Sequence, residues 1–501
     1  MELLPRSRYA YVLAAVLLLA AGRTNALPPG GGLDRVNHII VLTQENHSFD
    51  NYLGTLPWSR DTHYHPPAKA GGPCDPSDHQ CVDGLDCRVG KDRKLSCSND
   101  NPLDGHKVEV SHQTSYCTCN PAHEWIQAHL EANFSDPNSP HNLGNGFARE
   151  NAPKKTATAM SYYTDADLPF YSALAETFAV SDRHFSSVVG PTLPNRMYLM
   201  AATSFGHVLT NKVDNTPPVK SGYRPITPTI FDRLDSNNVK WVEYYEIGEI
   251  GQAHLTPPRP YGQLFRDPSI PNFQPLDKFF AAAKAGTLAQ VVFIDLNEHE
   301  HPPLDVRVGQ HQVARVVEAL RNSPNWNDST LLLTYDENGG FYDHVHPPAA
   351  PSPDGIPPGK CADKNAPPLS QTPGNGANCQ RSAQAQEQLC AKASKDERCA
   401  DFTQMGFRVP LIAISPFARP HYVSHVTTDH TSILALIEKR FLDGEHLTAR
   451  DGGANTPEDM FDFTSMTPPS LKANVPATLA PEPVDLKCRL PWVVLDRLTC
   501  G

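Results

Sequence analysis

Residues 334–344, with the sequence TYDENGGFYDH, decide the fold class of this 501-residue chain. The stretch follows an apolar run, residues 330–334, that has the composition of a buried strand, and it then places Asp336 and Glu337 together before two glycines. Because glycine lets the backbone turn sharply, the two carboxylates are expected at the end of that strand. This arrangement predicts a site for a hard cation, although Asp, Asn and Gly are also the ordinary residues of an acidic surface turn.

A second apolar run, residues 36–42, is followed by the sequence TQENHSFD at residues 43–50, which again places oxygen ligands just past a strand. Two strand ends of this kind can share one ion, with Glu45 and Asn46 facing the carboxylates of the first stretch. Carboxylate and amide oxygens suit calcium, magnesium or manganese, whereas structural zinc sites are typically built from thiolates and imidazoles. We expect one divalent ion, calcium first, with magnesium, manganese or zinc left open by the sequence.

The apolar runs predict an α/β fold. Strand candidates alternate with helical patterns along the chain, as expected for helices that cover a mostly parallel sheet. The five strand candidates are residues 36–42, 241–245, 291–296, 330–334 and 409–415. Ligands gathered beyond the carboxyl ends of the strands are the usual geometry of an open α/β sheet.

Two helices are predicted with defined first turns. The first begins at Asp305, whose side chain can cap the first turn. Its apolar residues recur at i, i+3, i+4 and i+7, namely Val313, Val316, Val317 and Leu320. The second helix follows Asp429, and its apolar side carries Ile433, Leu436, Ile437 and Phe441.

The first 26 residues look like a secretory signal. Arg6 and Arg8 precede an apolar run over residues 10–21, and small residues lead to a cleavage position after Ala26. A membrane anchor is the competing interpretation, but the run is shorter than the ~20 residues that span a bilayer. We therefore expect a secreted protein, extracellular or periplasmic, without a stable membrane anchor and with one domain over residues 27–501.

The charge balance limits the partners. The net charge is -12 at pH 7, and removal of residues 1–26, which hold three arginines and one glutamate, lowers it to -14. A negative surface disfavours nucleic acids and anionic membrane surfaces as electrostatic partners.

Twelve cysteines, an even number, lie in three clusters outside the strand candidates. Because the chain begins with a predicted export signal, these cysteines are expected to form disulfides. The sequence does not determine their pairing. A zinc site at Cys117 and Cys119 is the alternative, but their spacing does not fit a C-x2-C knuckle. The first two cysteine clusters lie in Pro-, Gly- and Asn-rich insertions, residues 66–119 and 347–401. These insertions either rim the site or are surface loops. The third cluster is expected to attach a Pro-rich tail, residues 468–501, to the rest of the protein.

Five segments taken together resemble the phosphoesterase family that contains bacterial phospholipases C, plant non-specific phospholipases C and a branch of secreted acid phosphatases. They follow the family's order over about 400 residues, which is too much agreement for a chance match. The segments are residues 45–50 (ENHSFD), 190–196 (GPTLPNR), 300–303 (EHPP), 336–344, and 429–432 (DHTS) continuing into 437–441 (IEKRF).

The resemblance implies an alkaline-phosphatase-like α/β/α sandwich with a mostly parallel central sheet. It also implies a nucleophile at Thr192, where the family has Thr in the phospholipases and Ser in the acid phosphatases. On local grounds alone, a threonine between Gly190-Pro191 and Pro194-Asn195 is more typical of a turn cap than of a nucleophile. In the family one metal ion touches the nucleophile's oxygen and is held by the residues that match Glu45, Asn46, Asp336 and Glu337.

Histidines are the expected proton carriers because their unperturbed pKa lies near ~6.5. His301 matches the family's active-site histidine, and His123 stands at about the place of another, so both are candidate catalytic residues. Five further residues are expected to bind substrate or to support the site: Asn145, His344, His430, Asn195 and Arg196. The sequence departs from the family at His47, where many relatives carry Arg, and at Asn145, where some have Asp.

The resemblance implies a secreted, metal-dependent phosphoric ester hydrolase of the phospholipase C type. Its expected substrate is a phosphatidylcholine-like lipid, cleaved to diacylglycerol and the phospho-head group through a phosphothreonine. The adjacent active-site histidine pair of the acid phosphatases has no counterpart here, which favours the phospholipase branch. A broad-specificity acid phosphatase is the first alternative, and an inactive secreted binding protein is the second.

Overall fold

The computed structural model describes residues 32–91, 94–133, 144–210, 228–246, 270–296, 300–360, 375–392 and 400–464. The predicted signal, residues 1–26, and the Pro-rich tail, residues 468–501, lie outside these ranges. Within them, every helix is too short or too polar to span a lipid bilayer.

The centre of the molecule is an eight-stranded sheet in the order β11-β10-β12-β1-β13-β14-β8-β15. Strand β14 runs antiparallel to both of its neighbours, and every other pair is parallel. The strands are β1 (His38–Gln44), β8 (Ala179–Ser181), β10 (Trp241–Tyr245), β11 (Phe273–Pro275), β12 (Val291–Asp295), β13 (Ser329–Tyr335), β14 (Leu411–Ile414) and β15 (Tyr422–Ser424). All five predicted strands are present, and β8, β11 and β15 are additional.

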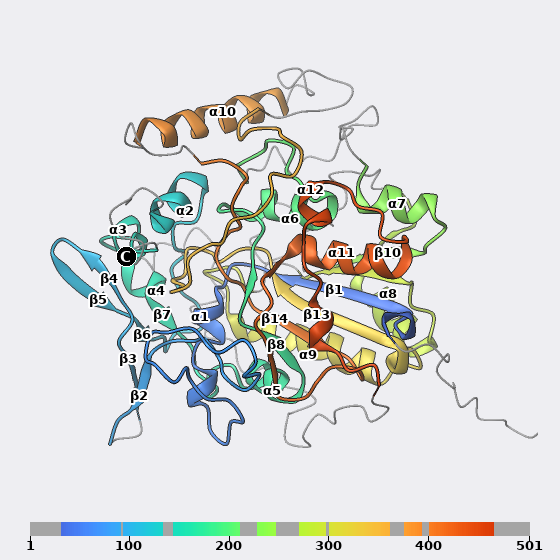
Figure 1. Ribbon diagram of the computed structural model, residues 1–501, viewed down its shortest axis with the longest axis horizontal. Coiled ribbons are helices and arrows are strands. Elements are labelled where there is room, and N and C mark those ends of the chain that lie inside the picture. Colours follow the sequence, from blue (N-terminus) through green and yellow to red (C-terminus); the bar gives the residue numbers. More distant parts are fainter. Residues whose placement is uncertain are drawn as a thin grey trace, which may run out of the picture.

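Helices cover both faces of this sheet (Figure 1). Successive residues of a strand point to opposite faces, so Ile40 and Leu42 pack with one set of helices and Ile39 and Val41 with the other. The first set is α5 (Pro169–Thr177), α8 (Leu276–Ala285) and α9 (Val306–Arg321). The second set is α6 (Thr192–Ala201), α7 (Ile230–Ser236) and α11 (His430–Phe441). The predicted α/β/α sandwich with a mostly parallel sheet is therefore confirmed.

Both predicted helix starts are confirmed. Asp305 is the N-cap of α9, and its carboxylate accepts the backbone N–H of Arg307 at 3.0 Å. Asp429 caps α11 in the same way and forms a capping box with Ser432. These caps satisfy N–H groups that would otherwise have no partner in the first turn, so the helix starts are fixed by local chemistry.

The first insertion is built from short hairpins held by disulfides. Its strands are β2 (Cys87–Val89), β3 (Leu95–Cys97), β4 (Asp100–Leu103), β5 (His106–Glu109) and β6 (Ser111–His112), and β6 pairs with β7 (Ser161–Tyr162). Two disulfides join Cys74 to Cys81 and Cys87 to Cys97. Cys117 and Cys119 are disulfide-bonded as well, which excludes the zinc alternative for that pair.

The second insertion contains a helix, α10 (Asn375–Lys392), that the sequence did not indicate. It packs against α2 (Trp125–Ala132), where the indole N–H of Trp125 donates to Gln386 at 2.9 Å. The remaining short elements are α1 (Phe49–Tyr52), α3 (Phe147–Glu150), α4 (Thr156–Ala159), α12 (Ala449–Gly452), β9 (His184–Phe185), β16 (Thr428–Asp429) and the 3-10 turns Leu33–Arg35, Leu56–Trp58, Trp326–Asp328 and Pro457–Met460.

Candidate active site

The predicted ligands lie together at the carboxyl edge of the sheet. Strands β1 and β13 are parallel neighbours, and their last residues, Gln44 and Tyr335, pair with each other. The next two residues of each strand therefore meet beyond the sheet, and they are Glu45, Asn46, Asp336 and Glu337.

The backbone at this edge is fitted closely. Asn46 has a left-handed conformation, with φ of 66°, and Gly339 has φ of 62°. A Cβ atom at position 339 would lie 2.4 Å from the carbonyl oxygen of Asn46. Only glycine fits there, so one member of the glycine pair is required for the two strand ends to approach each other.

Asp336 organises the cluster. Its Oδ1 atom accepts the backbone N–H of Asn46 at 3.3 Å and that of Glu337 at 2.7 Å. Its Oδ2 atom accepts from the Nε atom of Arg196 at 3.1 Å. This carboxylate therefore fixes the backbone of both strand ends.

Two buried oxygens of the cluster have no hydrogen-bond partner in the part of the chain that the structure describes, Asn46 Oδ1 and Glu337 Oε1. Burial and the nearby Asp336 carboxylate raise the pKa of Glu337 well above its usual range. Buried polar atoms are nearly always paired, so unpaired oxygens from two strand ends indicate a missing positive partner. Carboxylate and amide oxygens are the donors that a hard divalent cation takes, and the residues present fit such an ion.

Arg196 lies underneath this cluster. Its guanidinium contacts Asp295 at 2.8 Å, Asp336 at 3.1 Å and Glu45 at 3.6 Å, and its side chain is buried. The sequence left open whether Arg196 binds substrate or supports the site. The structure places it behind the carboxylates, where it balances part of their charge.

Thr192 is the first residue of α6, and the loop before it is held by Asn195. The Asn195 amide donates to the carbonyls of Val188, Gly190 and Pro191 at 3.2, 3.0 and 3.2 Å, and its Oδ1 atom accepts from Val188 N–H at 3.0 Å. Asn195 therefore positions the turn that presents the Thr192 hydroxyl at the start of a helix. Backbone N–H groups at such a start favour phosphate.

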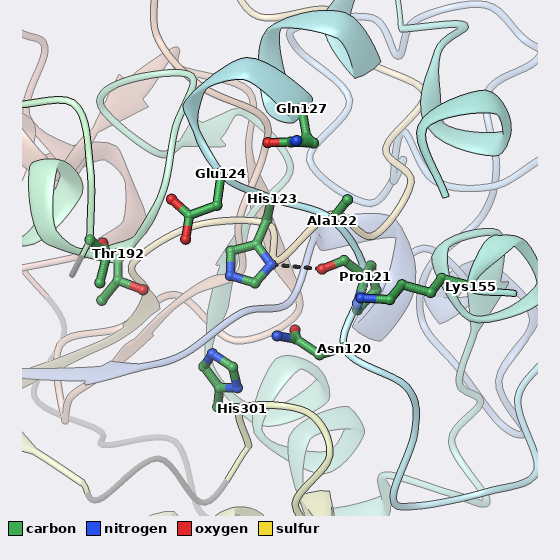
Figure 2. Close-up of a pocket in the computed structure, with 10 residues that line it drawn as sticks. Asn120, Pro121, Ala122, His123, Glu124, Gln127, Lys155, Thr192 and His301 are labelled. Carbon is green, nitrogen blue, oxygen red and sulfur yellow. Dashed lines mark hydrogen bonds between the residues drawn. The ribbon is translucent and has the colours of Figure 1, made fainter. Parts of the chain in front are cut away.

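The Thr192 side chain opens into a cavity of about 410 Å³ (Figure 2). His123 and His301 line the same cavity, so the three predicted catalytic residues meet in one space. The other lining residues are Asn120, Pro121, Ala122, Glu124, Gln127, Lys155 and Thr210. Among the described residues the wall comes from residues 120–127 and not from the two insertions, contrary to the possibility that the insertions rim the site.

The two histidines are oriented by carbonyl groups. His123 Nδ1 lies 2.9 Å from Pro121 O and its Nε2 lies 3.5 Å from Asn46 Nδ2, while His301 Nδ1 lies 2.6 Å from Pro302 O. Burial and the neighbouring His301 lower the pKa of His123 to about 3, so His123 is neutral. A neutral ring that donates from Nδ1 accepts at Nε2, which turns the Asn46 amide N–H₂ towards it and leaves Oδ1 for a cation.

Glu300, the residue before His301, is anchored in a buried polar cluster. Its buried carboxyl group accepts from Gln44 at 2.7 Å, from Tyr335 at 2.6 Å and from Tyr171. Burial raises the pKa of Glu300 to about 7. The sequence placed Glu300 in a motif but gave it no role, because its partners are far apart along the chain.

Two other histidines of the matched segments are buried supports. His430 Nε2 lies 2.9 Å from the carbonyl of Tyr335, the last residue of β13. His47 lies between Asn51 Oδ1 at 2.8 Å and Glu300 O at 2.9 Å, and burial lowers its pKa to about 3. Both residues fix the backbone around the strand ends.

Asn145 and His344 do not line the Thr192 cavity. They line a second cavity of about 320 Å³, together with residues of the first insertion. His344 lies 2.7 Å from Asp50 and 3.1 Å from Asp83, and Asn145 accepts from the Asn133 amide at 2.6 Å. The turn after Glu337 separates the two ends of the 334–344 stretch, which sequence adjacency did not reveal.

Comparisons with known proteins identify the family of this chain. The profile of the phosphoesterase family matches residues 36–442. Non-specific phospholipase C5 of Arabidopsis thaliana is 28% identical over 488 residues, which cover 90% of this chain and 78% of that protein. Phospholipase C A of Mycobacterium tuberculosis is 30% identical over 475 residues, covering 88% and 80%. Non-specific phospholipase C1 of Arabidopsis thaliana is 31% identical over 451 residues, covering 85% and 71%.

Similar solved structures are more distant. Murine ectonucleotide pyrophosphatase/phosphodiesterase 5 has a TM-score of 0.33 and 12% identity, covering 59% of this chain and 94% of that one. A protein in the alkaline phosphatase superfamily from Vibrio parahaemolyticus has a TM-score of 0.29 and 11% identity, covering 60% and 64%. On the family match and the relatives of 30% identity and above, the chain belongs to the phosphoesterase family, the phosphoric ester hydrolases that its motifs resemble.

Proposed function

We propose that this protein is a metal-dependent phospholipase C. It cleaves phosphatidylcholine-like lipids to diacylglycerol and the phospho-head group through a phosphorylated Thr192. The observation that carries the proposal is the meeting of Thr192, His123 and His301 in one cavity beside the strand ends that hold the unpaired oxygens. The phospholipases C among the relatives support this choice of substrate.

The residues that would hold the ion are Glu45, Asn46, Asp336 and Glu337, with the Thr192 hydroxyl as a further oxygen. Calcium is the proposed ion, since all of these donors are oxygens. When bound there, a divalent cation supplies positive charge that favours the alkoxide form of a hydroxyl and neutralises phosphoryl oxygens.

The chain supplies the remaining chemistry. The Thr192 hydroxyl gives up its proton to solvent as its oxygen attacks phosphorus, an O–P bond forms, and the bond from phosphorus to the glycerol oxygen breaks. The departing oxygen takes a proton from a histidine, and water later releases the phospho-head group from Thr192. His301 is the proposed proton donor, because burial keeps His123 neutral with a pKa of about 3 and therefore a poor acid at neutral pH.

An acid phosphatase uses the same core residues and is the second candidate. Its substrates are monoesters, and the cavity around Thr192 has room for either class. An inactive binding protein is a third possibility, against which the intact set of Thr192 and the four proposed ligands counts.

We further propose that the protein is exported. The apolar run near the amino terminus with its following small residues supports this, as do the disulfides of Cys74 with Cys81 and Cys87 with Cys97. Disulfides persist in oxidising compartments and are rare in the cytosol.

The test compares Thr192→Ala with Thr192→Ser. The alanine variant should lose at least ~10³-fold in kcat, whereas the serine variant keeps a hydroxyl and retains measurable turnover. Phosphocholine release from dihexanoyl phosphatidylcholine supports the phospholipase, and phosphate release from p-nitrophenyl phosphate alone supports the phosphatase. Near-normal turnover by Thr192→Ala would contradict the role of Thr192 in either reaction.

A further inference from the structure

Glu124 lies at the mouth of the Thr192 cavity, and its side chain does not cap the helix that follows it. It is the residue before α2, where a side chain would ordinarily accept a backbone N–H of the first turn. The Glu124 side chain makes no such bond. It is exposed and lines the cavity instead.

The cavity carries one other charged group at its edge, Lys155. Within the described ranges, neither Glu124 nor Lys155 makes an ion pair with another residue. Figure 2 shows the Glu124 carboxylate on the side of His123 that faces Thr192, with Lys155 on the opposite side. The cavity mouth therefore offers the Glu124 carboxyl group, whose pKa is raised to about 7 by desolvation at the cavity wall, and the Lys155 side chain to whatever enters it.

The reaction proposed above keeps the head group in this cavity. Diacylglycerol leaves first, and the phospho-head group stays attached to Thr192 until water releases it. A phosphodiester is an anion, so a carboxylate beside Thr192 repels it unless a positive group lies between or next to them. In a choline or ethanolamine phosphodiester the head group itself brings that positive charge.

We propose that Glu124 is a specificity-determining residue that binds the cationic ammonium of the head group. This inference rests on the proposed phospholipase C function and names the head groups that the cavity selects. Lys155 lies on the opposite side of His123 and does not pair with Glu124. Glycerol head groups lack a cation and leave Glu124 unpaired, so they are poorer substrates.

The experiment compares Glu124→Gln and Glu124→Lys with the unchanged protein on short-chain phospholipids that remain monomeric, so that membrane surface charge does not enter. The head groups are choline, ethanolamine and glycerol, and the quantity is the ratio of kcat/KM for choline to that for glycerol. Glu109→Gln, which removes the same charge at an exposed position on β5 outside the cavity, is the matched control.

We expect the choline-to-glycerol ratio to fall roughly 3- to 5-fold in Glu124→Gln, as for loss of an exposed ion pair, and further in Glu124→Lys. Glu109→Gln should keep the original ratio. An unchanged ratio in both Glu124 variants would overturn the inference. An equal loss of kcat/KM on all head groups with a shifted pH profile would overturn it as well, because that result would indicate a role of Glu124 in proton transfer. If the unchanged protein cleaves none of the phosphodiesters, the proposed function itself has failed, which is a separate outcome.

Discussion

The two ends of the stretch from Asp336 to His344 differ in how their charges are balanced. At the far end, Arg408 donates to Asp343 at 2.8 Å and to Asp50 at 2.9 Å, and His344 bridges Asp50 and Asp83. At the near end, Glu337 Oε1 and Asn46 Oδ1 have no hydrogen-bond partner among the described residues. The far end is neutralised by Arg408 and His344, whereas at the near end Arg196 pairs with Asp336 and Glu45 but leaves these two oxygens without a partner.

The difference shows what identifies a site in this chain. Carboxylates are plentiful at both ends, so a count of acidic residues does not separate them. A network that is neutralised within the protein stabilises the fold, whereas buried oxygens without a partner are costly to the fold and fit a ligand. The two ends should therefore respond in opposite ways to mutation.

The largest effect is expected from Glu337→Gln at the near end. The amide keeps the shape but removes a charge that would bind the cation, so kcat/KM should fall on the order of 10²- to 10⁴-fold. The Tm measured with chelator should stay the same or rise, because a buried carboxylate oxygen without a hydrogen-bond partner has been removed. Retained activity, or a Tm lower by many degrees, would contradict the assignment of this end to ligand binding.

The reverse pattern is expected from Arg408→Met at the far end. Removing one partner of a buried ion pair leaves Asp50 and Asp343 without their main counterion, and the free energy of unfolding should fall by about 3–5 kcal/mol. Turnover of the folded fraction at low temperature should remain close to that of the unchanged protein. Denaturant unfolding measures the free energy of unfolding. Arg408→Lys keeps the charge but loses the planar contacts, so its free energy of unfolding should lie between those of the unchanged protein and Arg408→Met.

Much of the fold could be predicted from the sequence because its signals are local. Strands β1, β10, β12, β13 and β14 are marked by apolar runs, and Asp305 and Asp429 mark helix starts by capping. Strands β8, β11 and β15 have three residues each, too few for an alternating pattern to show. Helix α10 has a weak apolar pattern, and its support comes from packing on α2.

The proposed ligands, Thr192 and His301 could be proposed from the sequence because they lie in the matched segments, whereas the surroundings of the site could not. Arg196 and Glu300 act through partners more than 30 residues away, which no spacing reveals. Glu124 and Lys155 carry no motif at all. Asn145 and His344 were expected near the site, but the chain turn at the glycine pair takes His344 to another cavity, which Asn145 also lines.

A smaller effect is expected from Gly309→Ala, a substitution that tests the role of Glu300. A Cβ atom at position 309 would lie 2.1 Å from Glu300 Cγ, so the carboxyl group must shift. Overpacking of this kind costs about 1–3 kcal/mol of stability, and a displaced Glu300 should also lower kcat through His301. Thermal unfolding and turnover measured together would check this, and unchanged values of both would show that Glu300 moves without consequence.

A pH dependence is also expected at the far end. Burial opposes the charged form of His344, but Asp50 and Asp83 outweigh it and raise its pKa from 6.5 to about 10. Because the pKa in the folded state is the higher one, the stabilisation is complete below pH about 6.5 and is lost as the pH rises through about 10. The difference in unfolding free energy between the unchanged protein and His344→Gln should therefore shrink from pH 6 to pH 10, and a constant difference would contradict the ion pairs.

The most direct measurement is a calorimetric titration with calcium, in which the heat of binding is recorded. It is carried out on the unchanged protein, on Asn46→Ala and on Asn145→Ala. We expect one ion per chain in the unchanged protein and in Asn145→Ala, and an affinity at least ~10-fold lower in Asn46→Ala. Equal affinity in all three proteins, or no bound divalent ion in any of them, would contradict the claim that the ends of β1 and β13 form the metal site beside Thr192.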